Sequence, residues 1–325
     1  MTDSALSQLK KLTTIVADSS DLSAIEQFRP LDATTNPSLI TVAASQPNNR
    51  ELIEAAYHQA KSEGLVHDAL IERTIDILTV KFGVEILKLI DGRVSTEVDA
   101  SLSYDTEATI TKAKELLALY KDYGVDQNRI LIKIASTWEG IQAAKALEAE
   151  GVHCNLTLLF GLHQAKACAD AKVTLISPFV GRILDWYKKA ENVDHYPIEQ
   201  DPGVLSVKAI FDYYKTHGVK TEVMGASFRS TEQVLALAGC DLLTVAPNLL
   251  AQLYEDQRTV TEQLIAPTAI AQITTELSES EFKESIQHDL MASQLLQSGI
   301  DGFIKARDQL SALLRQSFGE NAELK

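Results

Sequence analysis

Short hydrophobic and β-branched runs recur along the chain, and longer segments with helical periodicity separate them. Eight of these runs have the length and composition of β-strands. They cover residues 13–18, 31–35, 93–99, 129–135, 152–158, 173–179, 221–227 and 242–247. Because eight parallel strands alternating with helices close into a barrel, the pattern predicts an α/β fold of the (β/α)8 TIM-barrel type.

Residues that begin and end helices lie between the strand runs. Ser136, with a glutamate three positions later, predicts a capping box, and Gly151 predicts the end of the helix that follows. Ser230, with a glutamine three positions later, predicts another helix start, and Pro247 suits the first turn of the next helix. These crossovers are therefore one helix long.

Three segments are longer than a plain crossover requires. Residues 41–92 contain two helical patterns, and residues 181–219 contain a helix, a polar loop and a second helix. Residues 278–318 predict a helical tail that packs across one end of the barrel. Because no low-complexity linker or repeat divides the chain, we expect a single domain over residues 1–325.

The alternation of side chains along a strand predicts which of them reach the barrel axis. In the run 129–135 isoleucine occupies every second position, which is typical of the face that packs on helices, so Lys133 points inward. The same alternation directs six polar side chains of the neighbouring runs inward: Ser95, Glu97, Asp99, His153, Asn155 and Thr157. Four further candidates lie at or just beyond strand ends: Asp18, Asn36, Ser177 and Phe179.

A lysine on the barrel axis has two interpretations. A buried ammonium is costly unless it is paired, so Lys133 beside Glu97 and Asp18 is a structural ion pair or a lysine with a lowered pKa. A lysine of the second kind can attack a carbonyl and form a Schiff base. Taken singly, each candidate is better explained by a structural role, Asn36 for example by the turn before a proline. Their joint position at the carboxyl ends of strands favours a catalytic site.

Two arginines stand just beyond strand ends. Arg229 has Ser227 and Ser230 beside it at a predicted helix start, and Arg182 follows the sixth strand run. Loops after the last strands of such barrels often bind phosphate through backbone N–H groups and cationic side chains. We therefore expect an anionic ligand at Arg229, with a weaker indication for Arg182.

The composition limits which classes of partner and which cell compartment we expect. The chain has 30 Lys and Arg against 45 Asp and Glu, and a net charge of −15 argues against nucleic-acid and anionic-membrane partners. Three scattered cysteines predict no disulfide framework. The N-terminus has no signal-peptide pattern, and charges interrupt the most apolar long segment. We therefore expect a soluble cytoplasmic protein.

Two segments resemble the signature segments of the transaldolase family, DATTNPSLI at 32–40 and ILIKIASTWEGIQAA at 130–144. The resemblance continues through STEVDASLSYD, CNLTLLF, ISPFVGRILDWY and VMGASFR, but does not extend to residues 255–281. It implies transfer of a dihydroxyacetone unit between phosphorylated sugars in the non-oxidative pentose phosphate pathway. It further implies that no cofactor or metal is needed and that the protein is a homodimer.

The resemblance also implies a role for each candidate residue. Lys133 would form the Schiff base, and Asp18 would take the C4 hydroxyl proton as the carbon–carbon bond breaks. Glu97 would act through a water that it holds with Thr157. The residues that would bind the dihydroxyacetone unit are Asn36, Asn155 and Ser177. Those that would hold the phosphate are Arg182, Ser227 and Arg229.

Four alternatives remain open from the residues alone. A Schiff-base aldolase that releases dihydroxyacetone needs the same lysine, but such relatives resemble this chain with tyrosine in place of Phe179, so the phenylalanine favours transfer. A pyridoxal-phosphate barrel would need a partner for the pyridinium nitrogen, and this sequence shows none. A metal hydrolase would be expected to carry an HxH pair, and this sequence has none. An inactive scaffold has no reason to keep charged groups inside its barrel.

Overall fold

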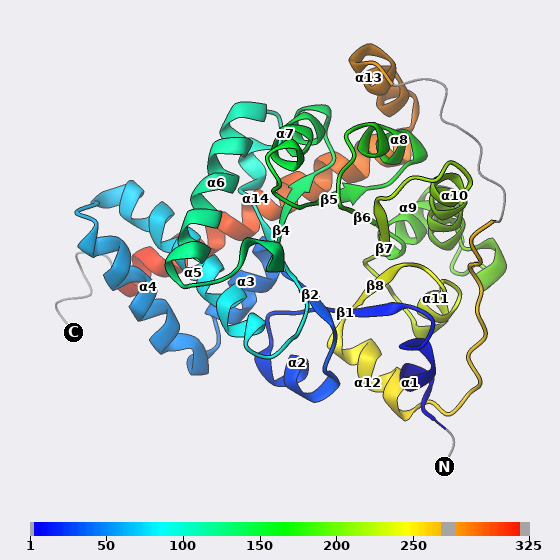
Figure 1. Cartoon of the computed structure of the whole chain (residues 1–325), viewed down its shortest axis with the longest axis horizontal. Coiled ribbons are helices and arrows are strands. Elements are labelled where there is room, and N and C mark those ends of the chain that lie inside the picture. Colours follow the sequence, from blue (N-terminus) through cyan, green and yellow to red (C-terminus); the bar gives the residue numbers. More distant parts are fainter. Residues whose placement is uncertain (1–2, 268–276, 319–325) are drawn as a thin grey trace.

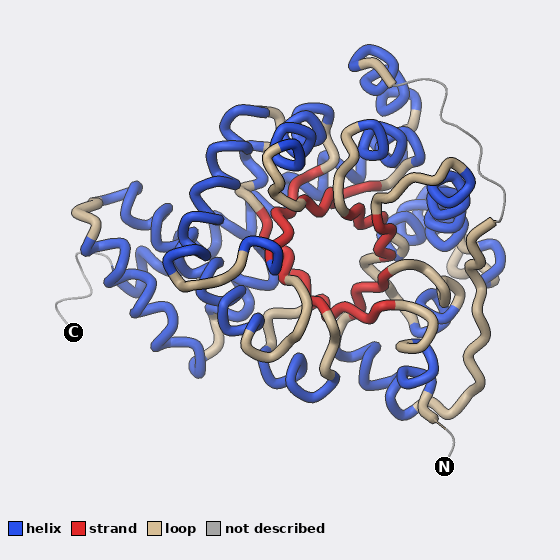
Figure 2. Tube along the Cα trace, in the orientation of Figure 1, coloured by secondary structure: helices blue, strands red, loops and turns tan. Residues whose placement is uncertain are grey.

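Eight parallel strands close into a ring, in chain order, in the computed structural model, which describes residues 3–267 and 277–318 (Figures 1 and 2). The strands are β1 (Thr14–Asp18), β2 (Asp32–Thr34), β3 (Val94–Glu97), β4 (Ile130–Ala135), β5 (Cys154–Leu159), β6 (Leu175–Pro178), β7 (Glu222–Gly225) and β8 (Leu242–Val245). Helices surround the ring on its outer side (Figure 2). The predicted (β/α)8 barrel is confirmed.

The helices include those predicted in the long connections. They are α1 (Ala5–Leu9), α2 (Leu22–Phe28), α3 (Pro37–Ala44), α4 (Arg50–Ser62), α5 (His67–Leu87), α6 (Thr106–Asp122), α7 (Trp138–Ala149), α8 (Leu162–Asp170), α9 (Gly181–Glu191), α10 (Pro202–Thr216), α11 (Thr231–Leu235), α12 (Pro247–Glu255), α13 (Glu279–His288) and α14 (Leu290–Phe318). The predicted N-cap Ser230 accepts a hydrogen bond from the backbone of Gln233, and Pro247 opens α12.

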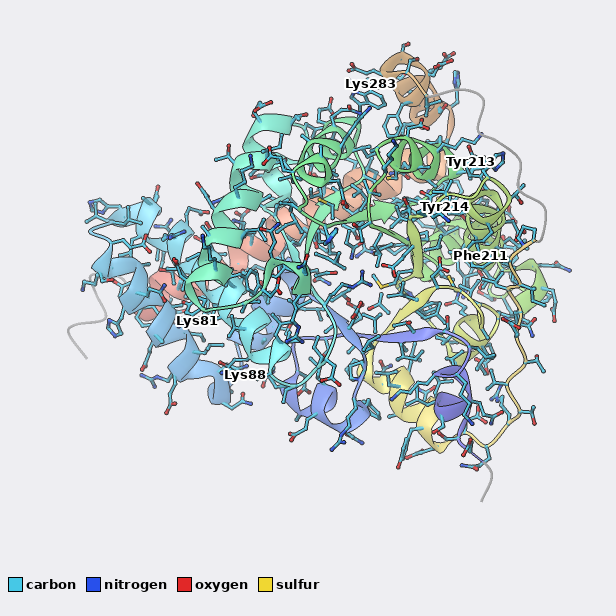
Figure 3. All side chains as sticks on the ribbon, in the orientation of Figure 1. Lys81, Lys88, Phe211, Tyr213, Tyr214 and Lys283 are labelled. Atoms are coloured by element: carbon cyan, nitrogen blue, oxygen red, sulfur yellow. The ribbon has the colours of Figure 1, made fainter. Side chains whose placement is uncertain are left out.

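Side chains fill the ring that the tube drawing leaves open (Figures 2 and 3). Alternate strand residues form a small buried apolar cluster that is separate from the core between strands and helices: Val16, Leu131, Leu175, Met224 and Leu242. Leu131 belongs to the alternation that predicts inward side chains, and its membership in this cluster confirms that direction. The cluster gives the barrel an apolar floor, as barrels of this type require.

Two local predictions are wrong, and both concern residues that come just after the end of a strand. Thr137, and not Ser136, caps α7, with its hydroxyl accepting from Gly140 N. Ser136 still follows the strand path, and its hydroxyl donates to the carbonyl of Thr157 at 2.7 Å. Asp99 lies beyond the end of β3 and does not reach the axis. Its carboxylate caps a short 3-10 helix and pairs with the Nε of Arg307 at 2.9 Å.

The helical tail packs across the barrel at the carboxyl ends of the strands, as predicted. Helix α14 runs past the strand ends in Figure 1 and contacts α3, α5 and β5. The Thr41 hydroxyl donates to the Ala306 carbonyl at 2.8 Å, which ties α3 to α14. Helix α13 carries Lys283, labelled in Figure 3, whose ammonium lies 3.2 Å from a Glu139 carboxylate oxygen of α7. Within the described residues no helix is long and apolar enough to cross a membrane.

Candidate active site

A layer with four polar residues out of five lies directly above the apolar floor of the barrel. Each residue of this layer lies two positions after a residue of the floor. In strand order they are Asp18, Lys133, Ser177, Ala226 and Thr244. Because strand side chains repeat every two residues, the whole layer faces the axis. All five line a cavity of about 180 Å³. The change from apolar residues to mostly polar residues therefore places a site at the carboxyl ends of the strands.

Lys133 is the central residue of this layer. The strand register sets it beside Glu97 on β3 and Asn155 on β5. Only 5% of the lysine is exposed, and its ammonium lies 3.3 Å from Glu97 Oε2. The ammonium also donates to the Thr35 carbonyl at 3.0 Å. One carboxylate and one carbonyl therefore hold a buried amine whose remaining side faces the cavity.

Glu97 has a carboxyl group that can gain or lose a proton near neutral pH. Burial raises its pKa to about 7, and the opposing effect of the Lys133 charge is smaller. Within the described chain its Oε2 forms no hydrogen bond beyond the ion pair with Lys133, and the buried hydroxyl of Thr157 also has no partner there. Both oxygen atoms can therefore still bind a polar group of a substrate or a water.

Asp18 ends β1, and its carboxylate is tied to the neighbouring strand. The Thr34 hydroxyl donates to Asp18 Oδ1 at 3.1 Å and lies 2.8 Å from the Thr244 hydroxyl. Burial raises the pKa of Asp18, while Lys133 and the Thr34 hydrogen bond oppose the shift. Thr34 and Thr244 are not among the predicted site residues. The same alternation that identified Lys133 would have found both, since each shares a strand face with a floor or site residue.

Three side chains form a hydrogen-bonded row next to Lys133. Ser177 donates to Asn155 Oδ1 at 2.6 Å, and Asn155 Nδ2 donates to the Ser95 hydroxyl at 3.0 Å. Asn36 caps α3 through a hydrogen bond from Leu39 N at 3.0 Å, and it also lines the cavity.

The cavity brings together most of the predicted site residues. Those that line it are Asp18, Asn36, Lys133, Thr157, Ser177, Phe179, Arg182, Ser227 and Arg229. Glu97 and Asn155 do not line it, but each contacts a residue that does. Phe303 of α14 also lines it and was not predicted. Over residues 3–267 and 277–318, no cluster of His, Cys, Asp or Glu could hold a metal ion.

The two arginines at the cavity are held differently. Arg182 lies over the ring of Phe179, with its guanidinium carbon 4.8 Å from the ring centroid. Arg229 is more exposed and pairs with Asp185, whose Oδ2 lies 2.9 Å from Nε and 2.8 Å from Nη2. Ser227, with a φ of 61°, brings its carbonyl to the backbone N–H of Gly181 at 2.7 Å. The two cations thus reach the cavity from the start of α9 and from the loop between β7 and α11.

Comparisons with known proteins show which family the chain belongs to. The sequence profile described as "Transaldolase/Fructose-6-phosphate aldolase" matches residues 15–314. A transaldolase from Nostoc sp. is 54% identical over 324 residues, which cover 97% of each chain. One from Synechocystis sp. is 53% identical over 317 residues, covering 96% of this chain and 80% of the relative. The chain therefore belongs to the transaldolase/fructose-6-phosphate aldolase family.

Proposed function

We propose that this protein is a transaldolase of the non-oxidative pentose phosphate pathway. It reversibly transfers a dihydroxyacetone unit from sedoheptulose 7-phosphate to glyceraldehyde 3-phosphate, giving erythrose 4-phosphate and fructose 6-phosphate. The observation that carries the proposal is the buried pair of Lys133 and Glu97 at 3.3 Å, open to a cavity that two arginines line. The high identity to proteins named transaldolase supports the same activity.

Lys133 supplies the nucleophile. Its neutral amine attacks the C2 carbonyl of the ketose, and the carbinolamine loses water to give a protonated imine. Glu97 takes the proton that the ammonium must lose and returns one to the departing hydroxyl, through a water shared with Thr157. A carboxyl pKa of about 7 suits both transfers at neutral pH. The unpartnered buried oxygens of Glu97 and Thr157 support this arrangement.

Asp18 moves the proton in the bond-breaking step. Its carboxylate takes the C4 hydroxyl proton, C4 becomes a carbonyl, and the electron pair of the C3–C4 bond moves toward the imine. The aldose leaves, and an enamine of three carbons stays on Lys133. When the acceptor aldehyde arrives, C3 attacks it and Asp18 returns the proton to the new alkoxide. The raised pKa of Asp18 makes the carboxyl a better proton acceptor than an ordinary aspartate.

The three-carbon unit must stay bound until an acceptor arrives. Asn155 and Ser177, joined by their 2.6 Å hydrogen bond, and Asn36 bind its hydroxyl groups. Phe179, which is 6% exposed, covers the unit with a ring that has no proton to donate. This favours transfer over the release of free dihydroxyacetone. Arg182, Arg229 and Ser227 bind the phosphate through charge-assisted hydrogen bonds.

Chemical trapping tests the proposal. Borohydride reduction in the presence of fructose 6-phosphate should attach a dihydroxyacetone-derived mass to the peptide that contains Lys133. Lys133→Met should abolish both trapping and the formation of sedoheptulose 7-phosphate from fructose 6-phosphate and erythrose 4-phosphate. Lys145→Met, at an exposed lysine of α7, is the matched control and should leave both intact. A label on another lysine would disprove the assignment.

We also propose that the protein works in the cytoplasm as a homodimer, an expectation that follows from the family resemblance. The three cysteines are free and buried, which is typical of proteins from reducing compartments. Light scattering of the purified protein would measure the mass of the assembly. A mass of one chain, 35.6 kDa, would contradict the dimer.

A further inference from the structure

Arg182 lies over two aromatic rings that come from different parts of the chain. Its guanidinium carbon is 4.8 Å from the Phe179 centroid and 5.8 Å from the Phe303 centroid. Both distances are within the range of cation–π attraction. Within the described chain the guanidinium forms no hydrogen bond or ion pair, so its N–H donors remain available to a ligand.

Phe303 belongs to the C-terminal helix and not to the barrel. It is 3% exposed and lines the active-site cavity, and it shares an apolar cluster with Phe179 and Ile300. One turn further along α14, Arg307 forms ion pairs with Asp99 at 2.9 Å and with Glu72 at 2.5 Å. Those charge pairs hold the helix, and therefore the Phe303 ring, against the carboxyl ends of the strands.

We propose that Phe303 is a positioning residue for phosphate binding, because it completes an aromatic clamp that keeps the Arg182 guanidinium directed into the cavity. The inference rests on the proposed function, in which Arg182 binds the phosphate of the sugar. An arginine side chain has considerable rotamer freedom, and binding an anion in one geometry requires that freedom to be lost. Two rings that hold the guanidinium before the ligand arrives reduce this cost.

The two arginines therefore prepare the phosphate subsite in different ways. Asp185 holds Arg229 through an ion pair that competes with the phosphate for the same N–H donors. The rings hold Arg182 by their faces and leave its donors in the guanidinium plane unused. The C-terminal helix thereby becomes part of substrate recognition, and its contribution should be specific for the phosphate and not for the reacting carbons.

Titration calorimetry with inorganic phosphate tests the clamp without any turnover. Phe303→Leu should weaken phosphate binding by roughly threefold to tenfold, because it removes one cation–π contact. Phe303→Tyr keeps a ring and should bind phosphate like the parent. Phe282→Leu, at a buried phenylalanine of α13 outside the cavity, is the matched control and should also bind like the parent. If Phe303→Leu does not fold, Phe303→Met replaces it.

A double-mutant cycle separates positioning from general packing. In an Arg182→Gln background, Phe303→Leu should cause no further rise in the KM for fructose 6-phosphate, and the KM for unphosphorylated fructose should not change in either background. Equal losses in the two backgrounds, or unchanged phosphate binding by Phe303→Leu, would overturn the clamp. Failure of the proposed function would appear separately, as a parent protein that binds phosphate without transferring dihydroxyacetone.

Discussion

Replacing Glu97 with glutamine removes a titrating group from the barrel interior while keeping its size. The folded-state pKa of about 7 lies above the ordinary value of 4.5. Between these pH values the folded chain holds a proton that the unfolded chain has lost, so rising pH favours unfolding in this window. One pKa unit corresponds to about 1.4 kcal/mol, so Glu97 ionisation lowers the free energy of unfolding by roughly 3 kcal/mol over the whole window.

Urea denaturation of the parent and of Glu97→Gln at several pH values measures this effect. The series should start near pH 5.5, above the isoelectric point of about 4.9, where a protein without net charge tends to aggregate. The free energy of unfolding of the variant minus that of the parent should rise by roughly 2 kcal/mol between pH 5.5 and 7 and then level off. Subtraction removes the contributions of the groups that titrate in both proteins.

Glu107→Gln makes the same chemical change on an exposed face of α6 and serves as the control. Its difference from the parent should change little over the same pH range. A Glu97→Gln difference that stays flat, or that falls as the pH rises, would refute the raised pKa of Glu97. The proton transfers assigned to Glu97 would then need another group.

Three further predictions concern the remaining site residues. Asp18→Asn should still allow borohydride trapping but slow turnover by about 10² to 10⁴-fold, and retention of more than a tenth of the rate would exclude it as the main base. Asp185→Asn should lower the KM for fructose 6-phosphate by roughly twofold to fivefold, because it frees Arg229, and a higher KM would mean that Asp185 orients the arginine. Phe179→Tyr should raise free dihydroxyacetone release while transfer falls, and a parallel loss of both activities would assign Phe179 to packing.

Alternation along the strands was sufficient to predict the chemical centre of the site. Isoleucine at every second position of residues 130–134 commits one face of β4 to the helices, and Lys133 then has only the axis to point to. Parallel pairing of consecutive strands sets Glu97 and Asn155 beside it. Both the direction of the Lys133 side chain and its strand neighbours depend only on nearby residues and on adjacent strands. The pattern within short segments is therefore enough to predict them.

The exact ends of the elements were less predictable. Ser136 and Thr137 both have the hydroxyl that an N-cap needs, and the choice between them depends on where β4 leaves the barrel. In the sequence, Asp99 continues the alternation of β3. The strand stops at Glu97, however, and the Asp99 carboxylate pairs with Arg307. Strand length is set by the partner strands, which a single segment does not reveal.

Only the tertiary structure decided what surrounds the candidate groups. Thr34 and Thr244, which meet at 2.8 Å beside Asp18, are 210 residues apart in the chain. The contact between Arg182 and Phe303 likewise exists because α14 crosses the strand ends, where ion pairs of Arg307 hold it. Local pattern tells which face a side chain takes. Its partners depend on closure of the barrel and docking of the last helix, because both are set by packing between distant segments.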